Sequence, residues 1–267
     1  MHEAKSPSAE ASIWAPVELK TPEFYAWQLG PLGLWIRRTD AEWQLAWVAG
    51  RNPLDERAVA AHVGGDPPPV DAELLRLASG AANRVIRLQP TLADRPIVVR
   101  PEHPFALLAG DEATFYVGSQ LWVSVLAGPT DRMLAEVATY RMSDTWFGPS
   151  TDEGELCYSS RTAARVTFGE VKSYPARAVT RITLRNASRR VLTVERLKVP
   201  VLNLGLFRAS NGRLLTQSLR VQCDDDGTLA VGIDDEPLDD LGAVELVADP
   251  RESLSGGFRR ALGALIG

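Results

Sequence analysis

Short runs of alternating apolar and polar residues, separated by Gly, Pro and Asn, recur along most of the chain. Trp43, Leu45 and Trp47 alternate with smaller or more polar side chains, as expected for a strand with one inner face. A Gly-Pro-Leu-Gly turn at 30–33 lies between two further runs, 24–29 and 34–38. The pattern therefore predicts antiparallel hairpins near the start of the chain.

Turn signals predict more hairpins in the second half. Asn211-Gly212 and a turn containing Asp226-Gly227 lie between alternating runs, the strongest local signal for a hairpin. The first joins 204–208 to 214–223, and the second places 219–223 opposite 229–233, so that the three runs form a meander. Gly118-Ser119 predicts a two-residue turn between 115–117 and 121–125, and 179–184 is expected to pair with 191–199.

Three segments are expected to be helical. Leu54–Val63 and Val70–Ser79 flank a Gly- and Pro-rich loop at 64–69. In the tail 250–267, four apolar residues fall near one helical face: Leu254, Phe258, Leu262 and Leu265. The tail either docks on the sheet or contacts a partner protein or a membrane surface.

Together these elements predict an all-β or β-dominated, antiparallel sandwich-like fold with two short helices in its N-terminal half and an amphipathic C-terminal helix. A boundary near Gly128-Pro129-Thr130 divides two β-rich lobes, with one continuous sandwich as the alternative. The expected organisation is a flexible N-terminus over 1–20, a lobe with two helices over 21–130, an antiparallel β lobe over 131–249 and a tail helix over 250–267.

Composition indicates a soluble globular protein. Of the 267 residues, 45% are hydrophobic and 24% are charged, within the range of folded soluble domains. The apolar runs are shorter than the ~18 residues needed to span a bilayer. The first residues lack the features of a signal peptide, and Cys157 and Cys223 are expected to be reduced thiols. These features predict a cytoplasmic protein.

Charge is unevenly distributed. Arg161 to Arg220 contains thirteen basic and two acidic residues, a local charge of +11, whereas 221–267 contains three basic and eleven acidic residues, a local charge of −8. The two segments are expected to neutralise each other in the fold. The acids Asp224, Asp225, Asp226, Asp234, Asp235, Glu236, Asp239 and Asp240 should lie near the Arg-rich strands, including Arg181, Arg185, Arg189 and Arg196. A nucleic-acid surface is the alternative, but the overall charge of −5 argues against it.

The segment 143–162 contains the densest cluster of polar, aromatic and turn residues. Its four carboxylates, at 144, 152, 153 and 155, could share a proton, pair with Arg161 or bind a hard cation, although their spacing does not match a calcium loop. At least one of Trp146 and Phe147 should anchor the segment to the core, with Leu156 and Tyr158 pointing inward. The candidate ligand- or partner-binding residues are Asp144, Trp146, Glu155, Tyr158 and Arg161.

Catalytic and metal-binding patterns are not found. Cys157 has no His beside it in the sequence, and the three histidines, His2, His62 and His103, are scattered. Neither the histidines nor the cysteines have zinc-ligand spacing, and no phosphate-binding loop follows a strand. We therefore assign no catalytic residue, metal or cofactor.

Four stretches carry a resemblance to a known family. SDTWFGPSTDEGELCYSSRT at 143–162 resembles the signature stretch of domain-of-unknown-function family 432, found in bacteria and archaea. The preceding strand at 134–142, LRNASRRVLTVERLKVPV at 184–201 and LGPLGLWIRR at 29–38 are also similar to it. The resemblance implies no substrate, cofactor or catalytic residue, and suggests an association with small mechanosensitive-type membrane channels.

The sequence thus favours a non-enzymatic binding or regulatory protein with a protein partner, such as a membrane channel, and peripheral membrane contact through the tail. One alternative is an enzyme, or a metal or carbohydrate site, at 144–161. The other is nucleic-acid binding through the Arg-rich strands of 161–220. The oligomeric state stays open.

Overall fold

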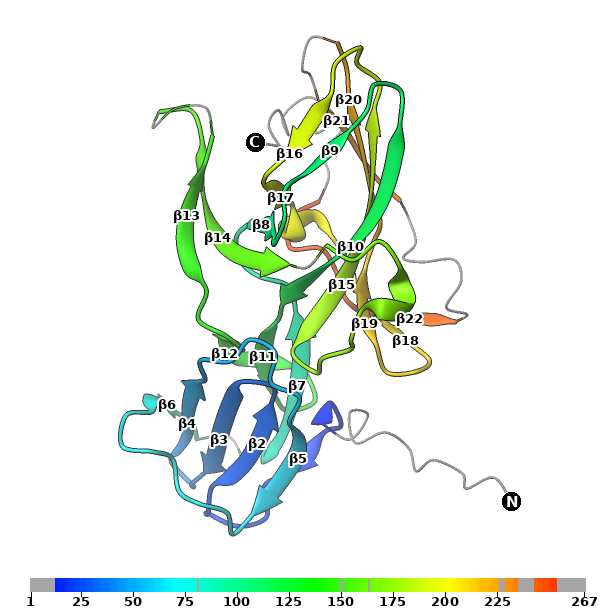
Figure 1. The fold of residues 1–267 in the computed structure, drawn as a ribbon. Helices are drawn as coiled ribbons and strands as arrows, with labels where there is room; N and C mark the ends of the chain where they lie inside the picture. Colours follow the sequence, from blue (N-terminus) through cyan, green and yellow to red (C-terminus); the bar gives the residue numbers. More distant parts are fainter. Residues whose placement is uncertain are drawn as a thin grey trace, which may run out of the picture. The chain divides into compact units, whose positions relative to one another are not determined.

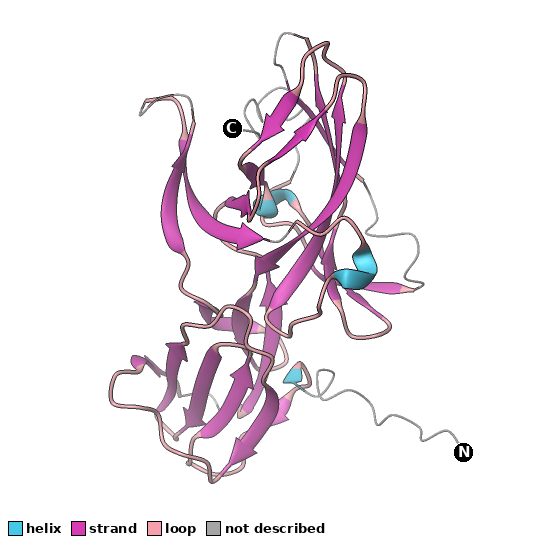
Figure 2. Cartoon of the chain, in the orientation of Figure 1, coloured by secondary structure: helices cyan, strands magenta, loops and turns pink. Residues whose placement is uncertain are grey.

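The computed structural model describes residues 13–80, 82–148, 150, 152–162, 164–225, 229–234 and 243–253. Strands dominate this part of the chain, with only short helical turns between them (Figure 2). The predicted β-dominated class is therefore confirmed. No helix in the described residues has the length and apolarity needed to cross a membrane.

The chain forms two compact units, each assembled from separate segments. Unit 1 contains Met1–Thr91, Gln120–Arg141 and Tyr174–Ala176, and unit 2 contains Leu92–Ser119, Met142–Ser173 and Arg177–Gly267. The expected boundary near residue 130 instead falls in the turn between two strands of unit 1 that pair with each other. A boundary drawn from local turn residues misses such a division because the segments interleave.

Unit 1 contains two antiparallel sheets (Figure 1). The larger has the order β5 (Ala58–Val63), β2 (Tyr25–Leu29), β3 (Leu32–Arg38), β4 (Glu42–Ala49) and β6 (Glu73–Ala78). The smaller has the order β1 (Val17–Glu18), β7 (Val85–Thr91), β11 (Trp122–Ala127) and β12 (Arg132–Ala138).

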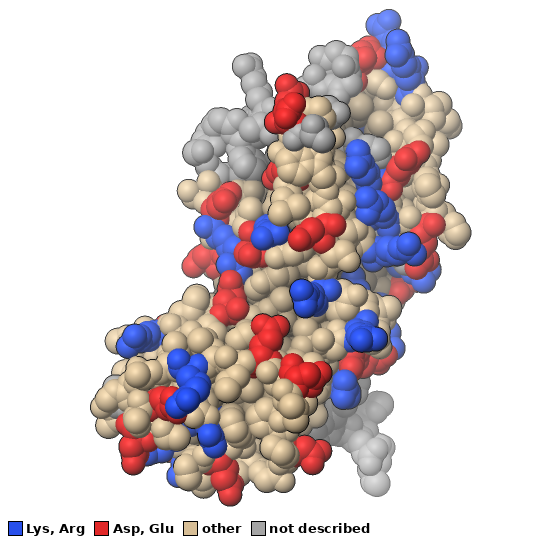
Figure 3. Space-filling view, turned by 90° about the vertical axis from the view of Figure 1, so that its left-hand side faces the viewer, with Lys and Arg blue, Asp and Glu red and all other residues tan. Residues whose placement is uncertain are grey.

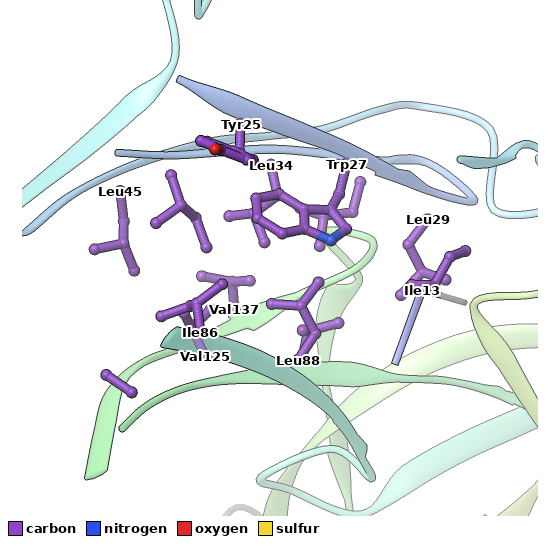
Figure 4. Close-up of a cluster of buried hydrophobic side chains, with 14 of the residues drawn as sticks. Ile13, Tyr25, Trp27, Leu29, Leu34, Leu45, Ile86, Leu88, Val125 and Val137 are labelled. Atoms are coloured by element: carbon purple, nitrogen blue, oxygen red, sulfur yellow. The ribbon is translucent and has the colours of Figure 1, made fainter. Parts of the chain in front are cut away.

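The core of unit 1 lies between these sheets, as Figure 4 shows. Trp27, Leu34 and Leu45 from the larger sheet pack with apolar residues of the smaller one, among them Ile86 and Val125. Burial of such side chains from water is the main stabilising contribution to a sandwich of this kind. The predicted hairpin at 24–38 and the strand around Trp43 both belong to this core.

The two helices expected in this half are wrong. Both segments contain strands instead, β5 beside β2 and β6 beside β4. In β6, Leu75 and Leu77 pack against the core while Leu74 is exposed, which is the two-residue period of a strand. Pairing with the open edges of β2 and β4 overrides the helix propensity of these Ala- and Leu-rich segments.

The flexible N-terminus expected over 1–20 is wrong for its last residues. Residues 1–12 lie outside the described residues, but Ile13 and Leu19 are fully buried in unit 1. Between them, β1 pairs with β7. The stretch 13–20 is therefore part of the sandwich and not a loose end.

The described residues of unit 2 form three sheets. The four-stranded sheet has the order β13 (Ser143–Phe147), β14 (Glu155–Thr162), β8 (Ile97–Pro101) and β17 (Leu197–Val199), and β9 (Phe105–Leu107) pairs with β16 (Leu192–Val194). The seven-stranded sheet contains β21 (Leu229–Ile233), β20 (Leu219–Cys223), β15 (Arg177–Asn186), β19 (Leu214–Thr216), β18 (Leu206–Ala209), β22 (Val244–Ala248) and β10 (Glu112–Gln120). The two short 3₁₀ helices are η1 (Phe168–Glu170) and η2 (Val201–Asn203).

Pairing in unit 2 is mixed and not purely antiparallel. β14 runs parallel to β8, and β15 runs parallel to both β19 and β20. The predicted hairpins β18–β19 and β20–β21 are confirmed, and Val221 lies opposite Val231 as expected. The predicted meander is wrong, because the run 214–223 contains two strands, β19 and β20, which lie on opposite sides of β15.

Two other predicted pairings are wrong. Gly118 and Ser119 lie inside β10, which pairs with β15, so they form no turn. The run 191–199 contains β16 and β17, which pair with β9 and β8 rather than with 179–184. Each of these strands takes a partner that is distant in the sequence, and no local turn signal indicates such pairing.

The tail predicted to be helical lies mostly outside the described residues, which end at 253. Its first residues are held in unit 2. The Arg251 guanidinium donates to the Leu92 carbonyl from Nε at 2.9 Å and from Nη2 at 2.6 Å. The Glu252 amide donates to the Leu202 carbonyl at 2.9 Å.

Candidate functional site

The segment predicted to carry function is the β13–β14 hairpin, a curved ribbon at the edge of the four-stranded sheet (Figure 1). Gly148 and Gly154 approach closely where the strands end. A Cβ on Gly148 would lie 2.1 Å from the Glu153 carbonyl oxygen and 2.4 Å from the Gly154 Cα. Only glycine fits at 148, because any side chain would displace the backbone opposite.

The hairpin separates the predicted site residues onto two faces. Asp144 lies opposite Tyr158, and Trp146 lies opposite Leu156, so these four share one face. Glu155 and Arg161 alternate with them and occupy the other face. The five candidates therefore form no single site, and the structure brings only Asp144, Trp146 and Tyr158 together.

Asp144 and Tyr158 are held by residues that sequence reasoning missed. Arg95 forms an ion pair with Asp144 at 3.2 Å between Nη1 and Oδ1, and its Cζ lies 5.3 Å from the centre of the Tyr158 ring. The Tyr158 hydroxyl donates to Asp94 Oδ1 at 2.9 Å. Burial, followed by the hydrogen bond to Asp94, raises the pKa of Tyr158 above its usual value. This phenol is a fixed hydrogen-bond donor and not a base.

Trp146 and Leu156 form an exposed apolar pair beside this cluster. Trp146 is 43% exposed and Leu156 is 45% exposed. The indole Nε1 donates to the Ser150 carbonyl at 2.8 Å, which fixes the ring. We call Arg95, Asp144, Trp146, Leu156 and Tyr158 the aromatic strip.

The opposite face has an apolar floor formed by Val98, Phe147 and Cys157. Phe147 is 3% exposed and therefore anchors the hairpin, as predicted. The expectation that Leu156 and Tyr158 point inward is wrong, because Cys157 is the fully buried residue between them. The pairing of β14 with β8 decides which face of the hairpin is buried, and the sequence of the hairpin alone does not contain this pairing.

Charged side chains surround this floor. Glu155 pairs with Lys198, a partner from β17 that the sequence did not indicate. The Arg196 Cζ lies 4.9 Å from the Phe147 ring centre, a cation–π contact. Arg161 is exposed and lies in register with Arg100 of β8.

Two observations bear on nucleophilic and metal chemistry at the hairpin. Burial, with a smaller contribution from Glu155, raises the pKa of the Cys157 thiol to about 11, so it is a poor nucleophile at neutral pH. Within the described residues, no group of three or more His, Cys, Asp or Glu side chains is placed to hold a metal ion.

The predicted neutralisation between basic and acidic segments is found in part, in three ion pairs among the described residues. Asp234 lies 3.0 Å from Arg220 and 3.7 Å from Arg181, and Asp225 lies 3.5 Å from Arg189. Asp226 and the acids of 235–240 lie outside the described residues. On the face shown in Figure 3, basic and acidic side chains are interspersed.

Unit 1 contains a cavity that the sequence did not predict. It has a volume of about 410 Å³ and lies between the β4–β6 edge and the β11–β12 turn. Trp43, Leu77 and Met133 give it apolar walls, and Asn83 and Arg132 are polar residues in its lining. Its size is within the range of ligand sites, but none of the predicted site residues contributes to it.

Of the three comparisons with known proteins, one gives a match. No curated protein and no solved structure matches the chain. A family model described as a protein of unknown function, DUF432, matches residues 13–265. This is nearly the whole chain, and it includes both units and the hairpin. The chain therefore belongs to the DUF432 family.

Proposed function

We propose that this protein is a non-enzymatic binding protein and that the aromatic strip of β13–β14 docks a partner protein. The observation that carries the proposal is the exposed cross-strand pair Trp146–Leu156 next to Arg95 and Tyr158. Trp, Tyr and Arg are the residue types that contribute most binding energy at protein interfaces.

The organisation of the strip supports a protein as the occupant. An apolar centre, Trp146 with Leu156, is bordered by the Arg95–Asp144 ion pair, as in the anatomy of transient interfaces. The strip lies on an edge hairpin, which presents surface area to a partner. In addition, the open edge of β13 can pair with an extended segment of the partner.

Preorganisation also favours recognition. Trp146 is fixed by its bond to Ser150, and Tyr158 is fixed between Arg95 and Asp94. Side chains that are already ordered lose little conformational entropy on binding. The strip can therefore bind without first rearranging.

Site-specific photo-crosslinking in the native host tests this proposal. A photoreactive residue placed at Leu156 should yield a discrete adduct, and the same residue at Val191, an exposed apolar position of unit 2, should not. Trp146→Ala should abolish the adduct without changing the thermal unfolding midpoint. Analysing soluble and membrane fractions separately distinguishes a soluble partner from a membrane channel.

Two outcomes would contradict the proposal. One is the same set of adducts from both positions, which would indicate random collision. The other is an adduct at 156 that Trp146→Ala leaves unchanged. An adduct whose mass equals that of two copies of this chain would identify self-association as the interaction.

A further inference from the structure

Three arginines form a row across the four-stranded sheet, on the face opposite the aromatic strip. Arg161 of β14 is in register with Arg100 of β8. In the antiparallel pair of β17 and β8, Leu197, the first residue of β17, lies opposite Val99, and Arg196 directly precedes it at the end of β8 that carries Arg100. Neighbouring strands are about 4.8 Å apart, so the three positions are adjacent.

This row lacks compensating carboxylates among the described residues. Glu155 is paired with Lys198, and no ion pair links Arg100, Arg161 or Arg196 to a described Asp or Glu. The Arg100 guanidinium contacts hydroxyls instead, Ser159 Oγ at 2.8 Å and Thr145 Oγ1 at 3.5 Å. Like charges directly opposite each other on neighbouring strands are destabilising, and a bound anion would relieve that repulsion.

The side chains are also partly ordered for binding. Ser159 orients the Arg100 guanidinium, and Phe147 supports that of Arg196. Arg161 is exposed, and none of its five N–H donors has a described partner. The row therefore combines the unused donors of Arg161 with two guanidinium groups that are already ordered.

Charge and geometry select the class of anion. One arginine fork satisfies one carboxylate, whereas a phosphate group carries about two negative charges and more acceptor oxygens. Three guanidinium groups, with the Ser159 and Thr145 hydroxyls beside that of Arg100, match the phosphate group. We propose that Arg100, Arg161 and Arg196 bind a phosphate group of a small ligand or a lipid headgroup.

Calorimetric titration of the full chain with sodium pyrophosphate at low ionic strength tests the site. We expect saturable binding, weakened about tenfold by Arg100→Gln and by Arg161→Gln, since each variant removes a charge-assisted contact. Arg51→Gln, the same charge change at an exposed position of unit 1, should leave the affinity unchanged. Trp146→Ala should also leave it unchanged, which separates this site from the aromatic strip.

Two further arms identify the source of the phosphate. Vesicles containing phosphatidic acid that bind the wild type but not Arg161→Gln would assign a lipid headgroup. Pyrophosphate binding without vesicle binding would assign a soluble ligand. The proposal is overturned by a lack of saturable pyrophosphate binding, by equal weakening in Arg51→Gln, or by binding of a single-stranded oligonucleotide that pyrophosphate does not displace.

Discussion

Trp146 and Leu156 face each other across the β13–β14 hairpin, and more than two-fifths of each side chain is exposed. One residue further along each strand, Phe147 and Cys157 are buried on the other face. The hairpin thus has one buried face and one exposed apolar face. Substitutions on the two faces should therefore differ in their effect on stability.

Truncation on the two faces should have opposite consequences for stability. Phe147→Ala should lower the free energy of unfolding by about 3 kcal/mol, because it removes a buried aromatic ring. Leu156→Ala should change it by less than about 0.5 kcal/mol, since that side chain is largely in water. Urea unfolding monitored by fluorescence gives both values. A large loss in Leu156→Ala would show that the aromatic strip belongs to the core.

Gly148 should resist substitution. Gly148→Ala should cost roughly 1–3 kcal/mol, because its Cβ would collide with the Glu153 carbonyl and the Gly154 Cα. Gly169→Ala is the matched control, because a Cβ at this position of η1 meets nothing within 4 Å. Thermal unfolding of the two variants should differ clearly, and equal midpoints would contradict the close approach at the hairpin end.

Cys157 should be inert below alkaline pH. Its pKa in the folded state is about 11, raised from 9.0, so the thiolate is scarce at pH 8. In a Cys223→Ser background, iodoacetamide should modify Cys157 far more slowly in the folded protein than in urea. Rapid labelling of the folded protein would contradict this assignment.

The raised pKa of Cys157 also makes the stability of the protein depend on pH. A raised folded-state pKa stabilises the folded protein fully below pH 9 and loses that contribution as the pH rises through 11. The free energy of unfolding should therefore fall between pH 9 and 11, and Cys157→Ala should reduce the steepness of that fall. Unchanged steepness in the variant would assign the alkaline loss to other groups.

Arg38 should be important for unit 1. It is 2% exposed and donates to the carbonyls of Thr39, Ser79 and Asn83, with its guanidinium 5.2 Å from the centre of the Trp43 ring. Arg38→Leu should lower the free energy of unfolding by about 2–4 kcal/mol, because buried carbonyls lose their donors. Arg132→Leu, at an exposed position of the same unit, should have little effect on denaturant unfolding. Similar losses in both variants would contradict a specific role for Arg38.

The sequence was informative where partners are close along the chain. The Gly-Pro turn at 30–31 and Asn211-Gly212 each lie between strands that pair as predicted, because local turn geometry sets those registers. Hydrophobic alternation likewise identified β4, and the cost of exposing an aromatic ring predicted that Trp146 or Phe147 anchors the hairpin, as Phe147 does. Both signals are contained in a window of a few residues.

Long-range pairing explains most of the errors. The parallel partners β8 and β14 come from distant parts of the chain, so nothing near Tyr158 indicates Arg95 or Asp94. The same pairing decides that Cys157 and not Leu156 is buried. For β5 and β6, the open edges of β2 and β4 outweighed local helix propensity. Predicting the site residues therefore requires the register between β14 and β8, and a short window of sequence does not contain that register.

The interleaving of the two units limits how this protein can evolve. Removing 120–141 as one block would take β11 and β12 from unit 1 and leave β7, which carries Ile86 and Leu88, without its neighbouring strand β11. Neither unit can be gained, lost or exchanged between genes as one uninterrupted cassette. Recombination is thus expected to transmit the two units together, as a single heritable module.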